Sequence, residues 1–238
     1  MPKAIINDQL INYELAGVRD FKLRTPALLL HGNGESMKIF EKFVPLLSAS
    51  RGFVLMDSRL QGGSEPAEDD TPLDISYELM ADDAIKLMED KLGIGEYDII
   101  GFSDGAITAI LMALRSIRVR KLILIGVNSD PSGLKPKMIR AIKKELSFAE
   151  RKKNPVPAML LRLMLTEPHI TNSELANVIC ETTVVYGQKD EAIRREHASA
   201  IADAIPRGSF VEIRGAGTRY PSRIRTSSPS WSDRCCKP

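Results

Sequence analysis

Residues that form covalent or metal cross-links are scarce in this 238-residue sequence, which contains three cysteines and three histidines. Cys180 stands alone and Cys235 and Cys236 are adjacent, so the sequence predicts neither a disulfide framework nor a metal site. No apolar run approaches the ~20 residues needed to cross a bilayer, so no stable membrane insertion is expected. The N-terminal residues lack the apolar core of a signal peptide, which predicts a cytoplasmic location.

An excess of one sign of charge is also missing, because 33 basic residues face 31 acidic ones. Hydrophobic residues make up 43% of the chain and charged residues 27%, which excludes a wholly disordered, collagenous or coiled-coil protein. The small positive excess lies at the C-terminal end, where residues 219–238 hold five basic residues and one acidic residue. The rest of the chain is weakly acidic, so it predicts no nucleic-acid partner.

Short β-branched or leucine-rich runs alternate with amphipathic segments, which predicts an α/β protein with a doubly wound or related sheet. Continuous apolar runs such as Leu122–Ile125 are typical of parallel strands buried on both faces. Strands are expected at Lys3–Asn7, Leu10–Ala16, Ala27–His31, Gly52–Met56, Tyr97–Gly101, Val119–Val127, Thr183–Tyr186 and Ser209–Arg214. Helices are expected at Met37–Leu47, Ile75–Leu92, Asp104–Ser116 and Arg195–Ile205. The first two strands are expected to form an antiparallel hairpin at the sheet edge.

Residues 128–178 break this alternation, since they contain two helical segments and no convincing strand. Lys135–Lys153 is strongly basic and Pro155–Leu165 is apolar, and their place between two strands suits a helical lid. Met159 and Met164 are expected to help roof an apolar pocket and to contact substrate. The basic segment is interpreted as a solvated face, with attraction to anionic lipid or to an acidic acyl carrier as the alternative.

Gly101-Phe102-Ser103-Asp104-Gly105 lies between an apolar strand and an alanine-rich helix, the context that a G-x-S-x-G nucleophile elbow requires. A serine on such a sharp turn projects its hydroxyl clear of the sheet, and side chains in place of the two glycines would collide with the turn. The helix N-terminus beneath it supplies free N–H groups and a positive dipole end. The alternative is a glycine-rich turn whose serine only caps the helix.

A second glycine turn, His31-Gly32-Asn33-Gly34, follows the third predicted strand. The carboxyl ends of parallel strands border the crevice where open α/β sheets bind ligands. The backbone N–H groups of Asn33 and Asp104 are therefore expected to form an oxyanion hole. The turn lacks the third glycine of a dinucleotide-binding fingerprint, so no nucleotide cofactor is expected.

Together these motifs resemble the α/β-hydrolase superfamily of esterase- and lipase-like enzymes. The resemblance covers residues 3–217, and it rests on His31-Gly32, Asp57-Ser58-Arg59, Gly62-Gly63-Ser64, the Ser103 elbow and Val184–Asp190 in their order along the strands. The Ser-Asp-Gly elbow is similar to that of valacyclovir-hydrolase-like members, while Leu60 stands where the family often has glycine. The resemblance implies a mostly parallel eight-stranded sheet with helices on both faces and a small helical lid. It divides the chain into a core (1–127 and 179–217), a lid (128–178) and an irregular tail (218–238).

The resemblance also implies a serine hydrolase that acts on a small carboxylic ester, or a related acyl bond, through an acyl-enzyme and without a cofactor. Ser103 would be the nucleophile, and Asp190, just past the strand at Thr183–Tyr186, would orient a catalytic histidine. A solvated turn residue is the alternative for Asp190, and Asp130 is a weaker candidate for the acid. A dehalogenase is disfavoured, because that chemistry needs a carboxylate nucleophile at the elbow.

A serine nucleophile needs a general base, and the histidine that the resemblance implies is missing. The family places it after a glycine-rich turn matching Gly215–Gly217, where this sequence has Thr218. Of the histidines present, His31 is expected to pack in the oxyanion turn, His169 to lie in a surface loop, and His197 to lie on the rim, away from the nucleophile.

From Thr218 onward, prolines, serines and basic residues occupy the place of the family's last helix. If the codon of Gly217 is GGC, the frame one base back reads histidine next and continues into a sequence compatible with a helix. The tail is therefore interpreted as translated out of frame relative to the gene of an intact parent enzyme. Poor or absent turnover is predicted, together with exposed apolar sheet surface where the helix is lost.

Two questions stay open at this level. Asp104 either only caps the helix that it begins or forms an anionic wall that favours a substrate bearing an ammonium group. The protein is either an impaired ester hydrolase or a non-catalytic hydrolase-fold protein that binds a small ligand or partner. The intact elbow favours the enzyme, with a small-molecule ester as its partner. The acyl group, the alcohol and the oligomeric state are left open.

Overall fold

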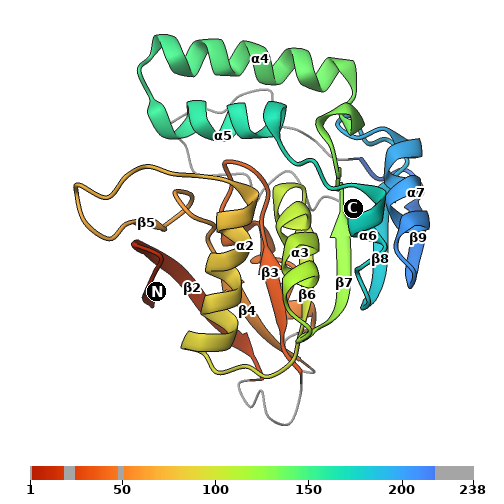
Figure 1. The fold of residues 1–238 in the computed structure, drawn as a ribbon, viewed down its shortest axis with the longest axis horizontal. Helices are drawn as coiled ribbons and strands as arrows, with labels where there is room; N and C mark the ends of the chain where they lie inside the picture. The colour runs from red at the N-terminus through yellow and green to blue at the C-terminus, as the bar shows by residue number, and fades with distance from the viewer. Residues whose placement is uncertain (1, 19–24, 48–50, 218–238) are drawn as a thin grey trace.

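A sheet of nine strands runs through the molecule in the order β1-β2-β4-β3-β6-β7-β8-β9, with β5 paired to β2 (Figure 1). The computed structural model describes residues 2–18, 25–47 and 51–217, so the predicted tail from Thr218 lies outside the described residues. The strands are β1 (Lys3–Ile6), β2 (Gln9–Gly17), β3 (Ala27–Leu30), β4 (Gly52–Met56), β5 (Glu65–Pro66), β6 (Tyr97–Phe102), β7 (Val119–Ile125), β8 (Glu181–Gly187) and β9 (Gly208–Ile213). All eight predicted strands are confirmed, and β5 is too short and too polar to leave a periodic signal.

Strand direction divides the sheet into two parts. β1 pairs with β2, and β2 with β4, in antiparallel register, which confirms the edge hairpin. From β4 through β3, β6, β7 and β8 to β9 every pairing is parallel. Every residue of β3 and β4 is buried, as expected for central strands covered on both faces. The carboxyl ends of the parallel strands thus share one edge of the sheet.

Helices fill the connections between the strands. They are η1 (Met37–Phe40), α1 (Val44–Leu47), α2 (Tyr77–Ile85), η2 (Lys86–Lys91), α3 (Asp104–Arg115), η3 (Pro131–Gly133), α4 (Pro136–Arg151), α5 (Pro155–Thr166), α6 (Asn172–Leu175) and α7 (Arg195–Ala204). The continuous helix predicted over Met37–Leu47 is wrong, because this segment forms the 3-10 turn η1 and the short α1. Pro45 has no N–H to donate and its ring clashes with a preceding helical turn, so a helix cannot run through it.

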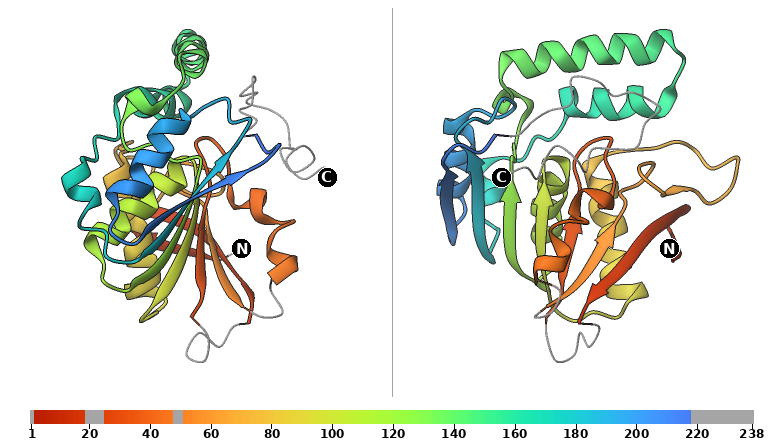
Figure 2. Two further views of the ribbon diagram at one scale, coloured as in Figure 1. Left: turned by 90° about the vertical axis from the view of Figure 1, so that its right-hand side faces the viewer. Right: turned by 180° about the vertical axis from the view of Figure 1, so that it is seen from behind.

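The sheet has helices on both faces (Figure 2). Leu28 and Leu30 of β3 pack into the large core on the side of α2 and α3, while Leu29 packs with η1 and α1 in a smaller core on the other side. Toward β9 this second side carries apolar side chains that remain exposed, at 44% for Val211 and 48% for Ile213. The tail in which the sequence predicts the loss of a covering helix begins at Thr218 and lies outside the described residues.

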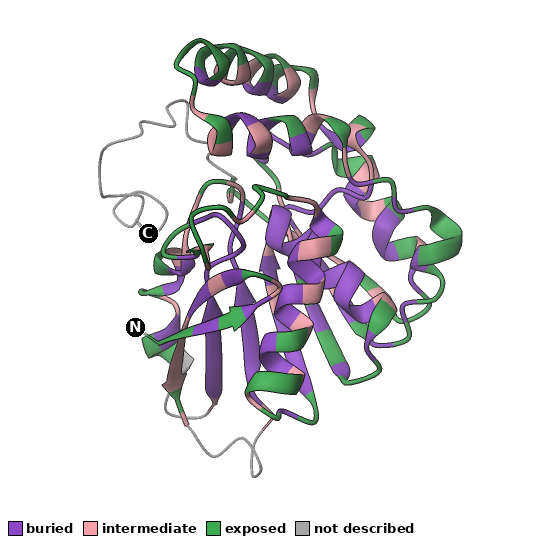
Figure 3. Ribbon diagram, turned by 60° about the vertical axis from the view of Figure 1, so that its left-hand side comes forward, coloured by how far each residue is buried: buried purple, intermediate pink, exposed green. Residues whose placement is uncertain are grey.

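α4 and α5 form a pair across the carboxyl ends of the strands (Figures 1 and 3). Met138, Ile142 and Ala149 make the buried side of α4, and its basic residues Lys137, Arg140, Lys143 and Lys144 are exposed, as the solvated-face interpretation expects. Among residues 2–18, 25–47 and 51–217, no helix has the length and apolar character to cross a membrane.

Candidate active site

The predicted nucleophile, Ser103, occupies a strained turn between β6 and α3. Its backbone lies at φ 52° and ψ −118°, a positive φ that residues other than glycine rarely adopt. A side chain at Gly101 would come within 2.4 Å of the Gly105 carbonyl oxygen, and one at Gly105 within 2.2 Å of the Leu30 carbonyl oxygen. The Ser103 N–H donates to the Ile125 carbonyl oxygen at 2.8 Å, which ties the turn to β7. Both glycines of the motif are therefore sterically required.

Asp104, the next residue, begins α3 and is only 3% exposed. Its carboxylate accepts a hydrogen bond from Asn33 Nδ2 at 2.8 Å, and the neighbouring side chains of Ser103 and Tyr77 also favour its charged form. Because these donors are neutral, burial prevails and raises the pKa of Asp104 to about 6. The carboxylate is thus bonded to the turn after β3, which is more than a helix cap alone requires.

A second carboxyl group, that of Glu35, lies beside Asp104 and is not predicted from the sequence. Its Oε2 accepts the Gly32 N–H at 3.0 Å. A methyl group added at Gly32 would lie 2.8 Å from this oxygen and 3.2 Å from the Cβ of Ser103, so the carboxyl group and the serine are close neighbours. Burial and the negative charge of Asp104 raise the pKa of Glu35 to about 7. The one sequence signal for it is a glutamate directly after a glycine turn.

The expected oxyanion turn is anchored on three sides. Asn33 Nδ2 also donates to the Leu160 carbonyl oxygen of α5 at 3.1 Å, and the Gly34 N–H donates to Gln61 Oε1 at 2.7 Å. Among the described residues, the Asn33 N–H donates to no backbone acceptor. The turn therefore leaves the Asn33 N–H available to an oxyanion.

A cavity of ≈ 170 Å³ lies between the turns after β3 and β4 and helix α5. Its lining residues are Asn33, Gly34, Glu35, Leu60, Gln61, Gly62, Val156, Pro157 and Leu160. The predicted substrate contacts Met159 and Met164 lie on the same helix, with Met164 buried. A larger hollow of ≈ 360 Å³ is lined by α4, α5 and their connection, so it belongs to the helix pair rather than to the elbow.

Asp190, the predicted acid, lies just past β8 and is 3% exposed. Its Oδ1 accepts the N–H groups of Ala192 at 2.7 Å and Ile193 at 2.8 Å, which fix the carboxylate in place. Gly217, which precedes Thr218, packs against this turn: a Cβ there would lie 2.8 Å from the carbonyl oxygen of Lys189, next to Asp190. Thr218 itself lies outside the described residues.

All three histidine rings have partners other than the serine. His31 Nδ1 contacts the Gly32 carbonyl oxygen at 2.7 Å and its Nε2 accepts the Ser58 N–H at 2.9 Å, and burial lowers the pKa of His31. His197 Nε2 accepts a backbone N–H at 3.1 Å. His169 is exposed, and its Nδ1 lies 2.9 Å from Asp130, the weaker candidate for the acid. In the described residues, none of these hydrogen bonds joins an imidazole to Ser103.

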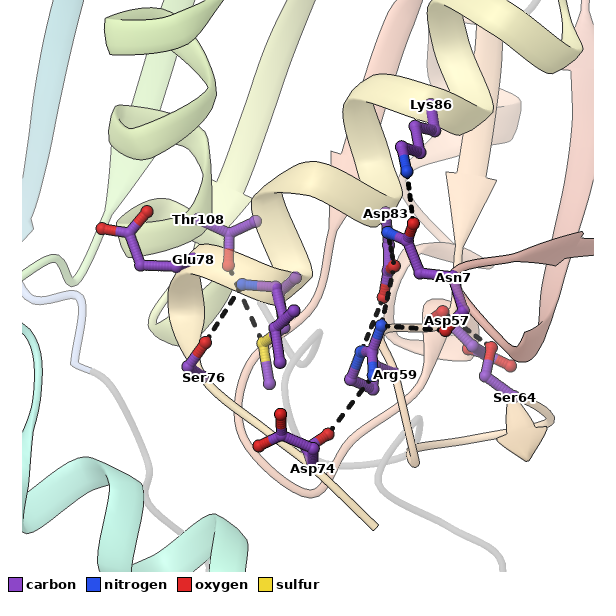
Figure 4. A network of polar contacts seen from close by, with 12 residues as sticks. Asn7, Asp57, Arg59, Ser64, Asp74, Ser76, Glu78, Asp83, Lys86 and Thr108 are labelled. Carbon is purple, nitrogen blue, oxygen red and sulfur yellow. Dashed lines mark hydrogen bonds and ion pairs between the residues drawn. The ribbon is translucent and has the colours of Figure 1, made fainter. Parts of the chain in front are cut away.

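The loop after β4 is held by a buried polar network (Figure 4). Arg59 meets Asp83 with two contacts, Nε to Oδ2 at 2.8 Å and Nη2 to Oδ1 at 3.0 Å, and Asn7 Nδ2 donates to Asp83 at 2.8 Å. Asp57 accepts the Met37 N–H at 2.7 Å from the neighbouring turn. Leu60 in this loop has φ 59°, a conformation that explains why glycine suits its position.

Comparisons with known proteins agree with this geometry. A family model described as the alpha/beta hydrolase fold matches residues 25–158. The mouse serine hydrolase BPHL is 26% identical over 238 residues, covering 90% of this chain and 78% of the mouse protein. The enol-lactonase from Burkholderia xenovorans has a TM-score of 0.71 at 20% identity, covering 89% of this chain and 91% of its own. A thermophilic esterase from Thermogutta terrifontis has a TM-score of 0.69 at 23% identity, covering 88% and 86%.

Proposed function

The chain belongs to the α/β-hydrolase fold family, and on that premise we propose that it is a serine hydrolase acting on a small carboxylic ester through an acyl-enzyme at Ser103. The observation that carries the proposal is the strained Ser103 backbone at φ 52°, held between two glycines that no side chain could replace. Such strain persists only where surrounding structure imposes it, and it clusters at functional sites. Relationship to the serine hydrolase BPHL supports the same chemistry.

The reaction needs charge stabilisation and an orienting acid as well as a nucleophile. The N–H groups of Asn33 and Asp104 would stabilise the tetrahedral oxyanion, and the buried Asp190 would orient a histidine supplied after Gly217. Because Thr218 occupies that position, turnover by this chain is proposed to be poor. The α4–α5 pair is proposed as the lid over the ≈ 170 Å³ cavity.

The nucleophile is tested by labelling the folded protein with a fluorophosphonate probe and locating the adduct by mass spectrometry. An adduct on Ser103 is expected, slow because the triad histidine is absent. Ser103→Ala should give none, while Ser132→Ala, at an exposed position, should label like the wild type. Equal labelling of Ser103→Ala and wild type would refute the serine-hydrolase proposal.

The cause of the missing base is tested at the gene. Sequencing the source DNA across codons 215–238 should show a histidine codon in the neighbouring frame, followed by a helix-forming sequence. The protein expressed from that frame should then hydrolyse p-nitrophenyl acetate faster than this chain. An uninterrupted natural gene encoding Thr218 would contradict the frame hypothesis.

For the substrate, the proposal favours an ester whose acyl part carries an ammonium group. The carboxyl groups of Asp104 and Glu35 lie at the elbow and the cavity wall. In the described part of the chain, no cation is among the groups that influence their pKa values. An alanine ester and an acetate ester of the same alcohol provide the comparison in the intact-frame protein. The alanine ester should have the higher kcat/KM, and equal values would exclude an ammonium preference.

A second candidate function is non-catalytic binding of a small ligand or partner by the same fold. It is favoured by the histidine positions, since His31 and His197 are hydrogen-bonded to backbone groups and His169 lies beside Asp130. Failure of the folded wild type to form any Ser103 adduct would favour this candidate over the enzyme.

A further inference from the structure

The side of α4 that lies opposite its buried residues carries a row of cations that the proposed reaction does not use (Figures 1 and 3). These exposed residues recur at helical spacing and together form the basic face: Lys137, Arg140, Lys144 and Arg151. We infer that the basic face binds a membrane surface that contains anionic phospholipid, with the protein lying on the bilayer rather than crossing it. Ser103 is not part of this surface, so the inference does not rest on the proposed function.

The distribution of charge on α4 works against the stability of the helix itself. Arg140 and Lys144 are four positions apart, so their like charges repel each other on one side of the helix. Lys137 lies in the first turn, where the helix macrodipole favours acidic residues, and this turn contains none. A helix face that only has to be soluble could alternate acidic and basic residues and gain stability from their pairing. The run of positive charge therefore indicates a negatively charged partner.

The rest of the chain, as far as the structure describes it, supplies little counter-charge to the basic face. Three of its four members form no ion pair with a described residue, and the fourth, Lys137, lies 3.4 Å from the exposed carboxylate of Glu191. Of the two acidic residues in α4, Glu150 pairs with Arg162 at 2.7 Å, and Glu145 lines the hollow between α4 and α5. Because an exposed ion pair contributes little, all four cations remain available to a partner.

An apolar feature at the C-terminal end of α4 favours a membrane over an acidic protein as this partner. Phe148 is 46% exposed, and Lys152 Nζ lies 5.8 Å from the centre of its ring. The ring borders the ≈ 360 Å³ hollow, whose lining includes Lys152 and Lys153 and the apolar residues Ala149, Pro157 and Leu161. An aromatic ring beside lysines can enter the boundary between headgroups and acyl chains while the lysines meet phosphate groups. A phospholipid offers both a phosphate and an acyl chain, whereas an acidic protein surface offers mainly charge.

The position of α4 in the molecule suits contact with a flat surface. The helix lies beyond α5, on the side of the pair that faces away from the sheet (Figures 1 and 2). From Lys137 to Arg151 the basic face spans about 21 Å along the helix axis. Pro157 of α5 lines both the hollow and the ≈ 170 Å³ cavity near the elbow. A bilayer bound to α4 would therefore lie close to the candidate active site.

The test is co-sedimentation of the full chain with lipid vesicles. The wild type should bind phosphatidylcholine vesicles that contain about one-third phosphatidylserine at about 0.1 M salt, and release them at about 1 M salt, where charges are screened. Vesicles of phosphatidylcholine alone should bind weakly. A triple variant with Arg140→Gln, Lys144→Gln and Arg151→Gln should lower the partition coefficient about 100-fold, since each cation near an anionic surface contributes about fivefold. Phe148→Ala should weaken binding about fivefold.

A matched control removes three exposed cations outside the α4–α5 pair and so lowers the net charge equally. Its substitutions are Lys38→Gln, Lys91→Gln and Arg207→Gln. This variant should bind the mixed vesicles like the wild type, because the inference assigns binding to one face and not to total charge. Circular dichroism checks that both triple variants keep the fold, as expected for exposed positions.

Four results would overturn the inference. They are no binding of the wild type to mixed vesicles at about 0.1 M salt, equal binding to neutral vesicles, equal losses in the two triple variants, and binding to soluble poly-L-glutamate that is as tight as binding to vesicles and unchanged in Phe148→Ala. The last result would identify an acidic protein as the partner. If the basic-face variant does not fold, the wild-type comparisons of salt and lipid charge decide. Sedimentation needs no turnover, so either result leaves the Ser103 labelling test unaffected.

Discussion

Two buried clusters of carboxyl groups in this molecule are compensated in opposite ways. In the loop after β4, Asp83 is fully buried and faces Arg59 across two short contacts. At the elbow, Asp104 is also removed from solvent, but it is bonded to the neutral Asn33 and lies near the neutral Tyr77 and the carboxyl group of Glu35. Burial raises the pKa in both clusters, and only at Asp83 does a guanidinium oppose the rise.

The comparison separates a structural use of buried charge from a chemical one. The ion pair joins the end of β4 to α2 and needs no reactivity, so a counter-charge is appropriate there. A carboxylate proposed to attract the ammonium group of a substrate is better served by neutral neighbours, because a resident cation would already compensate its charge. The lack of a cation beside Asp104 in the described residues is thus consistent with a functional role for this carboxylate.

Removing the cation from the compensated cluster should have the largest effect. Arg59→Met leaves Asp83 buried with Asn7 as its remaining described side-chain donor, and the free energy of unfolding at pH 7 should fall by about 3–5 kcal/mol. Urea denaturation measures this. The control Arg162→Met, which breaks the exposed pair with Glu150, should change stability little, and an equally small loss for Arg59→Met would break the comparison.

Neutralising the uncompensated carboxylate should have the opposite sign. The pKa of Asp104 is raised from 3.8 to about 6, so its contribution to stability is present below about pH 4 and is lost as pH rises through 6. The free energy of unfolding of Asp104→Asn minus that of the wild type should therefore be about 2–3 kcal/mol larger at pH 8 than at pH 4. The exposed change Asp203→Asn on α7 is the control, and a difference that does not depend on pH would contradict the prediction.

Changing an exposed carboxylate should have the smallest effect on stability. It tests the comparison at a carboxylate that is not buried. Asp130 raises the pKa of His169 through a direct hydrogen bond, but both side chains are open to solvent. Asp130→Asn should lower the His169 pKa toward its ordinary value in an NMR titration and leave the unfolding midpoint unchanged. A marked loss of stability would show that burial does not determine how strongly a carboxylate of this protein affects its stability.

The elements that can be predicted from the sequence are those with a strong local signal. Local sequence is enough to recognise the apolar runs of β3, β4 and β7 and the serine between two glycines. The hydrophobic pattern and the steric requirement both depend on residues that are close together in the chain. The helix over Met37–Leu47 fails, since Pro45 interrupts a pattern that is otherwise helical. Glu35 and Tyr77 cannot be assigned locally, because their partner Asp104 is distant along the chain.

The sequence by itself determined the α/β order of the elements, the strained serine turn and the absence of a histidine at position 218, since each depends on residues adjacent in the chain. Only the tertiary structure decided which carboxyl groups meet. Parallel strands bring the turns after β3 and β6 to one edge of the sheet, and there Glu35, Asn33 and Asp104 share a buried site. Their pKa values follow from that proximity and burial, which no local pattern encodes.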